Sequence, residues 1–416
     1  MRKEKLERNK RIYLDYAAST PVDDKVLKVM QKAENFAWSN PSSLHQEGER
    51  AKRILDEART AVACYLHCKT GEVFFTSGGT EGANIAIFGV IVKAKEWIDL
   101  PHVISSSIEH PAILKPLKKL ESNGEIQLTF VNPDKRGLIN PETIEKMMKQ
   151  NTILVCLMHA NNEIGTIQPI AKVAAVIKKV RKEKPLDHKE PLLNYPYLLV
   201  DAGQSVLYEN VSIERLGADI MILDGIKMYG PRGVGILVVR HGAALRPVAF
   251  GGGQERGLRP GTENAIAALG LAEALKIAAE KRERESFRLA KLRDYAIAKI
   301  LGEIPHSSLN GDPIRRLPNN INICFKSQGS PLKNFASKGD PLDYSEFLVI
   351  KLDTLGFAVS AASACSNLDQ ENPSYVIESL GKKECASSSL RFTLGRATQK
   401  SDLDKLIVAL KKIIKK

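Results

Sequence analysis

Short apolar runs without polar alternation recur through the first two-thirds of the chain. Runs of this kind, rich in Val, Ile, Leu and Phe, are typical of strands that are covered on both faces. They predict seven strands, at Glu72–Thr76, His102–Ser105, Ile126–Val131, Ile153–His159, Tyr197–Val200, Ile220–Leu223 and Gly235–Val239. Amphipathic stretches lie between them, such as Glu81–Lys95, Pro141–Lys149 and Ile170–Lys182. This alternation predicts βαβ units, and therefore an α/β fold with a mainly parallel seven-stranded sheet.

The pattern changes after a glycine-rich segment, Gly251–Thr262. A long helical stretch follows, and then a predicted strand and two further helices, at Asn264–Gly302, Asn320–Phe325, Asp343–Leu355 and Ser401–Lys415. We therefore expect residues 21–265 to form a large α/β domain. Residues 1–20 and 266–416 are expected to form a smaller α+β domain.

The composition supports a folded chain without a membrane anchor. The 416 residues are 43% hydrophobic, which is enough for a sizeable core, but no apolar run reaches 18 residues. The basic start, Met1–Arg11, has no apolar segment after it, so we expect no secretory signal. Much of the net charge of +13 lies at the two ends, where it indicates solvated termini or attraction to an acidic partner. No zinc-finger spacing or RNA-binding aromatic motif supports direct nucleic-acid binding.

The cysteine content indicates a reducing, cytoplasmic location. Six cysteines are too few for a dense disulfide framework in a chain of this length: Cys64, Cys68, Cys156, Cys324, Cys365 and Cys385. Cys64 and Cys68 are one helical turn apart, but no second pair completes a metal site. We interpret these two as helix packing and expect no metal.

Three segments carry candidate chemistry at predicted strand ends. The turn Thr76–Glu81 opens a helix, where glycines and free N–H groups can hold an anion such as a phosphate, although a plain capping turn fits as well. Asp201 follows a buried strand, where a carboxylate could keep the pyridine nitrogen of pyridoxal phosphate (PLP) protonated. Lys227 follows the next strand, 26 residues later, and could form a Schiff base with such a cofactor.

Cys365 lies in a run of small and polar residues, Ser360–Ser366. A free cysteine is most often buried and structural, but this setting favours an exposed, reactive thiol.

Together these segments resemble the cysteine desulfurases, in the class V aminotransferase group of fold-type I PLP enzymes. The resemblance extends in order from Tyr13 to Arg396, through the segments Tyr13–Val22, Ser39–His45, Phe75–Asn84, Glu109–Leu114, His159–Ile170, Val200–Ser205, Lys227–Gly235, Gly251–Asn264, Ser363–Ser366 and Leu390–Arg396. It implies catalytic roles for Cys365, Lys227 and His110, and a cofactor site formed by Gly79, Thr80, His110, Asn161, Asp201, Gln204, Asp224, Lys227 and Thr262. It implies substrate contacts by Asn40, Asn161 and Arg391.

Each of these residues has an implied task. Lys227 would hold the cofactor, and His110 would stack on its ring and help to move protons. Asp201 would pair with the ring nitrogen, Gln204 and Asn161 would contact the ring oxygen, and Gly79 and Thr80 would bind the phosphate. Thr262 would reach the cofactor of a neighbouring subunit, which implies a homodimer. Arg391 would bind the substrate carboxylate as a bidentate fork.

The implied reaction removes sulfur from L-cysteine. The Cys365 thiolate would take the sulfur as a persulfide and leave L-alanine, and the persulfide would pass to an iron–sulfur scaffold or to tRNA thiolation.

The sequence departs from the family before the lysine. Where the family has Ser-x-His-Lys, this chain has Asp224, Gly225, Ile226 and Lys227. Ile226 has no hydrogen-bonding group, and Asp224 brings a negative charge close to the expected phosphate. This predicts weaker PLP retention unless the side chain turns away or a cation such as Arg232 compensates. The segment Lys326–Asp343 also exceeds the family's usual length.

Two kinds of alternative stay open. Within PLP chemistry the chain could be a selenocysteine lyase or a class V aminotransferase. Outside it, the changes at Asp224 and Ile226 could mark a non-catalytic partner in sulfur transfer.

Overall fold

The computed structural model describes residues 11–183, 194–326, 344–361 and 373–414. Cys365 and nearly all of the segment Lys326–Asp343 lie outside the described residues.

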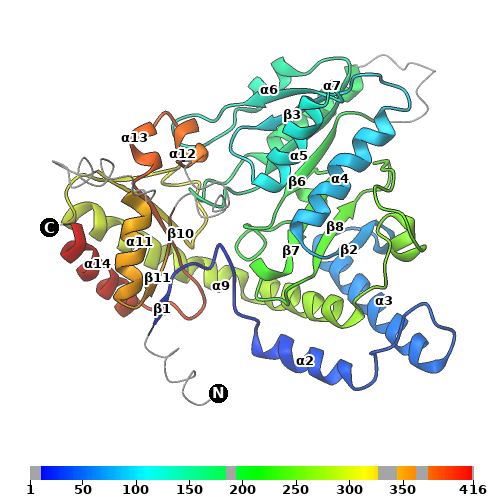
Figure 1. The fold of residues 1–416 in the computed structure, drawn as a ribbon, viewed down its shortest axis with the longest axis horizontal. Coiled ribbons are helices and arrows are strands. Elements are labelled where there is room, and N and C mark those ends of the chain that lie inside the picture. Colours follow the sequence, from blue (N-terminus) through cyan, green and yellow to red (C-terminus); the bar gives the residue numbers. More distant parts are fainter. Residues whose placement is uncertain (1–10, 184–193, 327–343, 362–372, 415–416) are drawn as a thin grey trace.

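A seven-stranded sheet forms the centre of the larger part of the molecule (Figure 1). Its strand order is β2-β8-β7-β6-β5-β3-β4. The strands are β2 (Val73–Thr76), β3 (His102–Ser106), β4 (Gln127–Val131), β5 (Thr152–Met158), β6 (Tyr197–Asp201), β7 (Ile220–Asp224) and β8 (Gly235–Val239). All seven predicted strands are present, each within two residues of its expected bounds.

One strand, β8, runs against its neighbours. It pairs antiparallel with both β7 and β2, whereas the other four pairs of adjacent strands are parallel. Only residues 225–234 connect β7 to β8, which is too short for the helical crossover that a parallel pair needs. The prediction of a mainly parallel sheet is therefore confirmed, and the exception has a simple cause.

Helices cover both faces of this sheet. Val155 and Leu157 of β5 face one core, and Leu154 and Cys156 face the other, as expected for a strand that is buried on both sides. The first core is closed by α3 (Gln46–Leu66), α6 (Pro141–Met147), α7 (Ile170–Glu183), α8 (Ile213–Leu216) and α9 (Ala265–Glu303). The second core is closed by α4 (Gly79–Ala94) and α5 (Pro111–Ser122).

A smaller antiparallel sheet lies beside the first. Its order is β12-β13-β10-β9, with β9 (Ser307–Leu309), β10 (Asn320–Phe325), β12 (Ser360–Ala361) and β13 (Ser389–Thr393). The helices of this part are α11 (Tyr344–Thr354), α12 (Tyr375–Ser379), α13 (Lys383–Ala386) and α14 (Lys400–Ile414). The N-terminal strand β1 (Ile12–Tyr13) joins this part by pairing in parallel with β11 (Phe357–Ala358).

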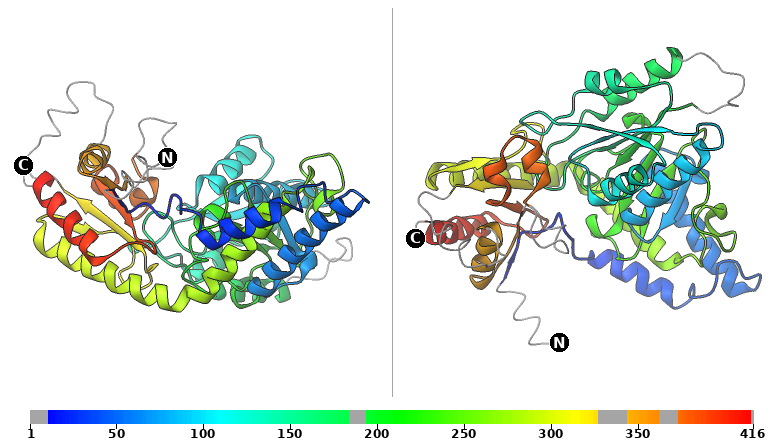
Figure 2. Two further views of the ribbon diagram at one scale, coloured as in Figure 1. Left: turned by 90° about the horizontal axis from the view of Figure 1, so that it is seen from below. Right: turned by 45° about the horizontal axis from the view of Figure 1, so that its top comes forward.

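The helix α9 connects the two sheets. It packs against α2 (Asp24–Glu34) and α3 in the larger part and against β9, β10 and α14 in the smaller part. Figure 2 shows it running along the base of the molecule beneath both parts. This helix begins at the expected boundary near residue 265 and contacts both parts, and we retain the division into two domains as a proposal.

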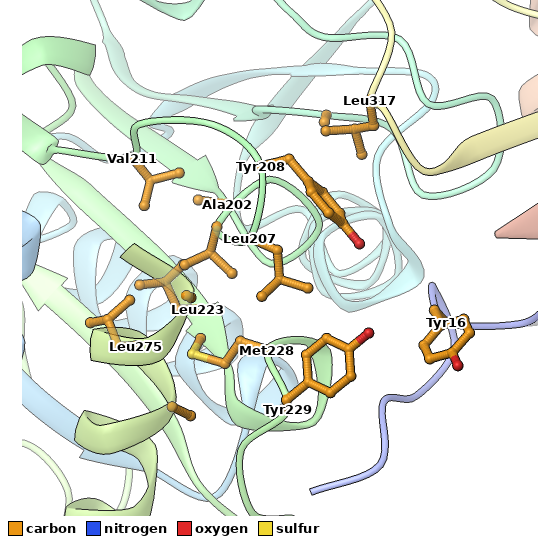
Figure 3. Close-up of a cluster of buried hydrophobic side chains, with 14 of the residues drawn as sticks. Tyr16, Ala202, Leu207, Tyr208, Val211, Leu223, Met228, Tyr229, Leu275 and Leu317 are labelled. Atoms are coloured by element: carbon orange, nitrogen blue, oxygen red, sulfur yellow. The ribbon is translucent and has the colours of Figure 1, made fainter. Parts of the chain in front are cut away.

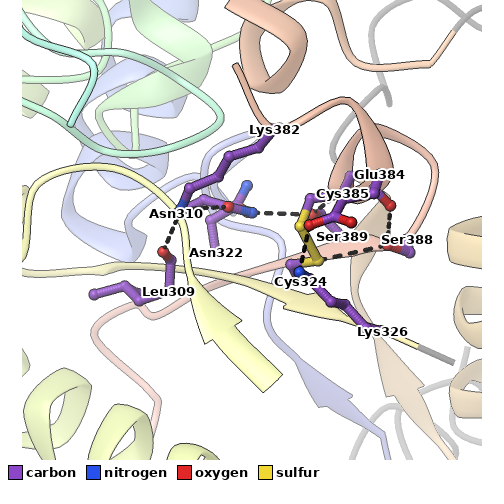
Figure 4. The surroundings of a disulfide bond; sticks show 10 residues. All are labelled: Leu309, Asn310, Asn322, Cys324, Lys326, Lys382, Glu384, Cys385, Ser388 and Ser389. Atoms are coloured by element: carbon purple, nitrogen blue, oxygen red, sulfur yellow. Dashed lines mark hydrogen bonds and ion pairs between the residues drawn. A yellow bond between two sulfur atoms is a disulfide. The ribbon is translucent and has the colours of Figure 1, made fainter. Parts of the chain in front are cut away.

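A disulfide joins Cys324 of β10 to Cys385 of α13 (Figure 4). The sequence did not predict this pair, which is separated by 61 residues, because only the tertiary fold brings β10 and α13 together. Both cysteines are buried. The interpretation of Cys64 and Cys68 as helix packing is correct only for Cys68, which packs against the core just after α3, because Cys64 is exposed.

No helix in the described part of the chain is long and apolar enough to cross a membrane. Within the same residues there is no cluster of three or more His, Cys, Asp or Glu side chains suited to a metal ion.

Candidate active site

A pocket lies at the carboxyl ends of β6 and β7, where parallel α/β sheets bind their ligands. The larger sheet supplies most of its wall, and the N-terminal segment and β13 supply the rest. Eight of the predicted site residues line it: Gly79, Thr80, His110, Asp201, Gln204, Asp224, Lys227 and Arg391. The tertiary structure thus gathers residues from both parts of the molecule around one cavity.

Lys227 ends the short 3-10 helix η2 (Gly225–Lys227), directly after β7. Its Nζ donates to the backbone oxygens of Ala17 at 2.8 Å and Ala18 at 2.7 Å. Gln204 donates to the same Ala17 oxygen at 3.0 Å. The N-terminal segment therefore holds the amine at one side of the pocket.

A hydrophobic cluster anchors the loops that carry Asp201 and Lys227 (Figure 3). Met228 is fully buried directly after Lys227, and Ala202 is fully buried directly after Asp201. Tyr229 packs in the same cluster, with its ring centroid 6.2 Å from that of Tyr16. Lys227 and Asp201 are thus each followed by a residue whose position is set by core packing.

The charges of Asp201 and His110 each shift the pKa of the other group. Burial raises the pKa of Asp201, although its carboxylate accepts a hydrogen bond from the Gly203 N–H at 2.9 Å. Burial lowers the pKa of His110, which favours the neutral ring. The His110 Nδ1 caps α5 by accepting from the Ala112 N–H at 3.1 Å. The proton of the neutral ring is therefore assigned to Nε2.

Glu109 and Glu163 are carboxylates buried behind the pocket. Burial raises the pKa of Glu109 to about 8 and that of Glu163 to about 7. Glu109 accepts from the Ser106 hydroxyl at 2.5 Å and from the Met158 N–H at 3.0 Å. Its second oxygen, Oε2, has no hydrogen-bond partner in the described part of the chain, which suits a protonated carboxyl group.

The start of α12 is fastened to these two residues. The Ser374 hydroxyl donates to Glu163 Oε2 at 2.5 Å, and the Tyr375 hydroxyl donates to the backbone oxygen of Glu109 at 2.6 Å. The first residues of α12 are therefore attached to residues that adjoin the pocket-lining His110 and Asn162.

Arg391 of β13 is 2% exposed, and its guanidinium reaches the pocket from the smaller sheet. Its Nη2 contacts the Asp15 carboxylate at 2.9 Å, and its Nη1 donates to the Asn162 backbone oxygen at 2.9 Å. Its Nε has no partner among the described residues. A buried cation with an unused donor is suited to a small carboxylate ligand.

Asp224 does not turn away from the expected phosphate position. Its Oδ2 accepts from the Gly79 N–H, at the start of α4, at 3.1 Å. The proposed compensating cation, Arg232, is exposed and donates instead to the Ser19 hydroxyl at 3.2 Å. Ile226 is absent from the pocket lining.

Four predicted site residues are not gathered in this pocket. Asn161 is buried beside it and holds a turn, because its side chain donates to Ile108 and accepts from the N–H groups of Glu163 and Ile164. Asn40 and Thr262 are exposed residues of loops and do not line the pocket. Cys365 lies outside the described residues.

Asp15, Ala17, Ala18 and Asn162 contribute to the site without having been predicted. All four lie in segments that carried the family resemblance, Tyr13–Val22 and His159–Ile170, so a signal was present. Their contacts use backbone oxygens or an ion pair across 376 residues, which no local pattern reveals.

Comparisons with known proteins agree with this geometry. The family described as "Aminotransferase class-V" matches residues 12–406. The chain is 37% identical over 410 residues to "Cysteine desulfurase IscS" of Dictyoglomus turgidum, covering 97% of this chain and 95% of that protein. It is 37% identical over 406 residues to "Cysteine desulfurase IscS 1" of Archaeoglobus fulgidus, covering 97% of each. A solved structure titled "NIFS-LIKE PROTEIN" is similar with a TM-score of 0.83 at 30% identity, covering 97% of this chain and 99% of that one.

These matches confirm the resemblance and the expected fold-type I architecture. The chain belongs to the class-V aminotransferase family of PLP-dependent enzymes.

Proposed function

We propose that this protein is a PLP-dependent cysteine desulfurase, which removes sulfur from L-cysteine and passes it to an acceptor. One observation carries the proposal. A single pocket brings together a lysine amine, a buried carboxylate, a histidine and a buried arginine, namely Lys227, Asp201, His110 and Arg391.

The ring and aldehyde ends of PLP fit the residues of this pocket. The Lys227 amine would hold the aldehyde carbon, and the Asp201 carboxylate would face the ring nitrogen. A protonated ring nitrogen would offset the burial that raises the pKa of Asp201, since an opposite charge favours the carboxylate. Gln204, Thr80 and Asn161 are further proposed contacts, and Thr262 would come from a second subunit. The bound cofactor supplies an electron sink for charge that develops at the substrate α-carbon.

The protein's own groups would orient the substrate and move protons. Arg391 would bind the carboxylate of cysteine with the help of its unused Nε donor, and Asn40 is a further candidate for this side of the substrate. Lys227 would transfer a proton at the α-carbon through its Nζ. His110 would donate from Nε2, because its Nδ1 already accepts from the Ala112 N–H.

Cys365 would receive the sulfur. Its thiolate attacks the sulfur of the substrate, so that an S–S bond forms and the C–S bond of cysteine breaks. The electron pair of the broken bond stays on carbon and takes up a proton, which completes the methyl group of L-alanine. The persulfide on Cys365 can then pass to another thiol.

The finer assignments belong to this proposal as well. The acceptor would be an iron–sulfur scaffold protein or an enzyme of tRNA thiolation, the protein would act as a homodimer, and its location would be the cytoplasm.

Three alternatives make different predictions. A selenocysteine lyase would prefer selenocysteine to cysteine, and a class V aminotransferase would have no need of Cys365. A non-catalytic sulfur-transfer partner would hold no cofactor.

The decisive experiment combines a spectrum with a product assay. The purified protein is mixed with PLP, and its visible absorption is recorded before and after L-cysteine is added. We expect a band that shifts with cysteine and is absent in Lys227→Ala, together with alanine and persulfide production that Cys365→Ser abolishes. Transamination that survives Cys365→Ser would favour the aminotransferase, and a protein without any band would favour the non-catalytic partner.

A further inference from the structure

Asp224 occupies the position where an anion would meet the start of α4. This helix has 16 residues and begins at Gly79, so its first N–H groups are donors without partners inside the helix. Asp224 Oδ2 accepts from the Gly79 N–H at 3.1 Å. Asp224 Oδ1 accepts from the Ile226 N–H at 3.2 Å. One carboxylate therefore accepts hydrogen bonds from N–H groups at the starts of both α4 and η2.

The backbone around Asp224 keeps the carboxylate in this place. Asp224 is the last residue of β7 and is paired with Gly235, the first residue of β8. A Cβ atom on Gly235 would lie 2.7 Å from the Gly78 backbone, so the backbone of β8 lies directly against the turn before α4. A Cβ atom on Gly79 would lie 3.3 Å from Asp224 Oδ2. The turn and the carboxylate are thus in contact, and the Gly79 N–H has little space for a second acceptor.

The charged side chains around Asp224 make contacts of their own. Glu81 places a second carboxylate on the same turn, where it accepts from the Ser77 N–H and pairs with Arg259 at 3.2 Å. Lys227 donates to the Ala17 and Ala18 oxygens, and Arg391 contacts Asp15. A phosphate group at the start of α4 would therefore meet negative charge in a partly buried setting, where like charges repel strongly.

We infer that Asp224 is an internal competitor for the cofactor's phosphate group, and that it removes most of the affinity which phosphate adds to cofactor binding. The inference rests on the proposed PLP site. It assigns Asp224 as a specificity-determining residue: the natural chain distinguishes PLP poorly from pyridoxal, the same aldehyde without phosphate.

The test compares the two aldehydes on the cofactor-free protein. Dissociation constants for PLP and for pyridoxal are measured by absorption titration of the wild type, Asp224→Asn and Asp224→Ser. The Asn variant keeps one oxygen that can accept from Gly79. It removes the charge and replaces the oxygen that accepts from Ile226 with an NH2 group. We expect it to bind PLP roughly tenfold more tightly or better, and to bind pyridoxal within about twofold of the wild type. Asp56→Asn, which removes an exposed charge on α3, should change neither constant.

A second readout needs no aldehyde. Inorganic phosphate should raise the melting temperature of the cofactor-free Asp224→Asn and Asp224→Ser variants, and leave that of the wild type unchanged.

The outcomes separate this inference from the proposed function. An equal ratio of PLP to pyridoxal affinity in the wild type and both variants, with normal Lys227-dependent binding, overturns the role of Asp224 alone. Weaker binding of both aldehydes by both folded variants would show that Asp224 supports the site and does not compete. If neither aldehyde binds to any form of the protein, both the inference and the proposed cofactor site fail.

Discussion

Arg391 is bound on two sides before any substrate arrives. Asp15 and the Asn162 backbone oxygen each contact one of its two terminal nitrogens, and its Nε has no protein partner among the described residues. Lysine could keep the charge of this residue, but it could not contact Asp15, Asn162 and a substrate carboxylate in one fixed plane.

We therefore expect Arg391→Lys to weaken cysteine binding. The KM for cysteine should rise about tenfold to a hundredfold, because a hydrogen bond to a charged group contributes about 1.5–3 kcal/mol. The PLP absorption band should persist. Steady-state kinetics check this, with the exposed Arg136→Lys as the matched control. A variant that loses kcat with an unchanged KM would argue against substrate binding by Arg391.

Glu109 makes stability depend on pH. Its pKa is raised to about 8 by burial, so the folded protein keeps a proton that the unfolded chain releases above about pH 4.5. The resulting stabilisation is fully present below pH 4.5 and is lost as the pH rises towards 8, at up to roughly 1.4 kcal/mol per pH unit.

Glu109→Gln should remove this dependence. Unfolding free energies are measured by urea denaturation. The value of the variant minus that of the wild type should increase as the pH rises from 4.5 to 8 and should then stay constant. Glu34→Gln, an exposed change in α2, should follow the wild type throughout. If the unfolding free energies of the wild type and Glu109→Gln changed in parallel with pH, this would contradict a buried, protonated Glu109 in the folded protein.

At the scale of elements, the disulfide joins α13 to β10, an inner strand of the smaller sheet. Figure 4 shows it beside a polar group in which Asn310 bonds Asn322 and Ser389. The link closes a long loop that includes residues 362–372, so it restricts the unfolded chain considerably.

A reductant should therefore destabilise the protein. In the cofactor-free state we expect the loss of about 2–4 kcal/mol, seen as a lower melting temperature and as two newly titratable thiols. The double variant Cys324→Ser with Cys385→Ser should start at the lower temperature and not respond to the reductant. An unchanged melting temperature of the reduced wild type would show that the link adds no stability.

At the scale of the whole molecule, Thr262 is the residue whose proposed role needs a second subunit. It is exposed in the loop before α9 and does not line the pocket of its own chain. Large exposed side chains on the same part of the molecule, Trp38, Leu44 and Phe250, are consistent with a covered surface in an assembly.

Mixed dimers test this role. Lys227→Ala and Thr262→Ala subunits are combined, and PLP binding to the hybrid is measured. If Thr262 acts across the interface, one of the two sites in the hybrid contains both Lys227 and Thr262, and it should regain wild-type affinity. Recovery should not occur if Thr262 serves its own chain. A protein that stays monomeric by light scattering would contradict the dimer itself.

The sequence alone determined the elements of the larger sheet and the chemistry at its edge. Continuous apolar runs are read correctly as strands buried on both faces, because burial on both faces removes the polar alternation. Asp201 and Lys227 follow two such strands, and the carboxyl ends of parallel strands meet at one edge. Local order along the chain was therefore enough to predict that these two residues share a site.

Only the tertiary structure decided which distant groups complete that site. The pairing of Asp15 with Arg391, the backbone oxygens that hold the Lys227 amine and the Cys324–Cys385 link all join segments far apart in sequence. The direction of the Asp224 side chain was open as well, since a strand end allows it to face solvent or α4. These features depend on how separate elements pack, and packing is set by the whole core and not by the residues next to each site.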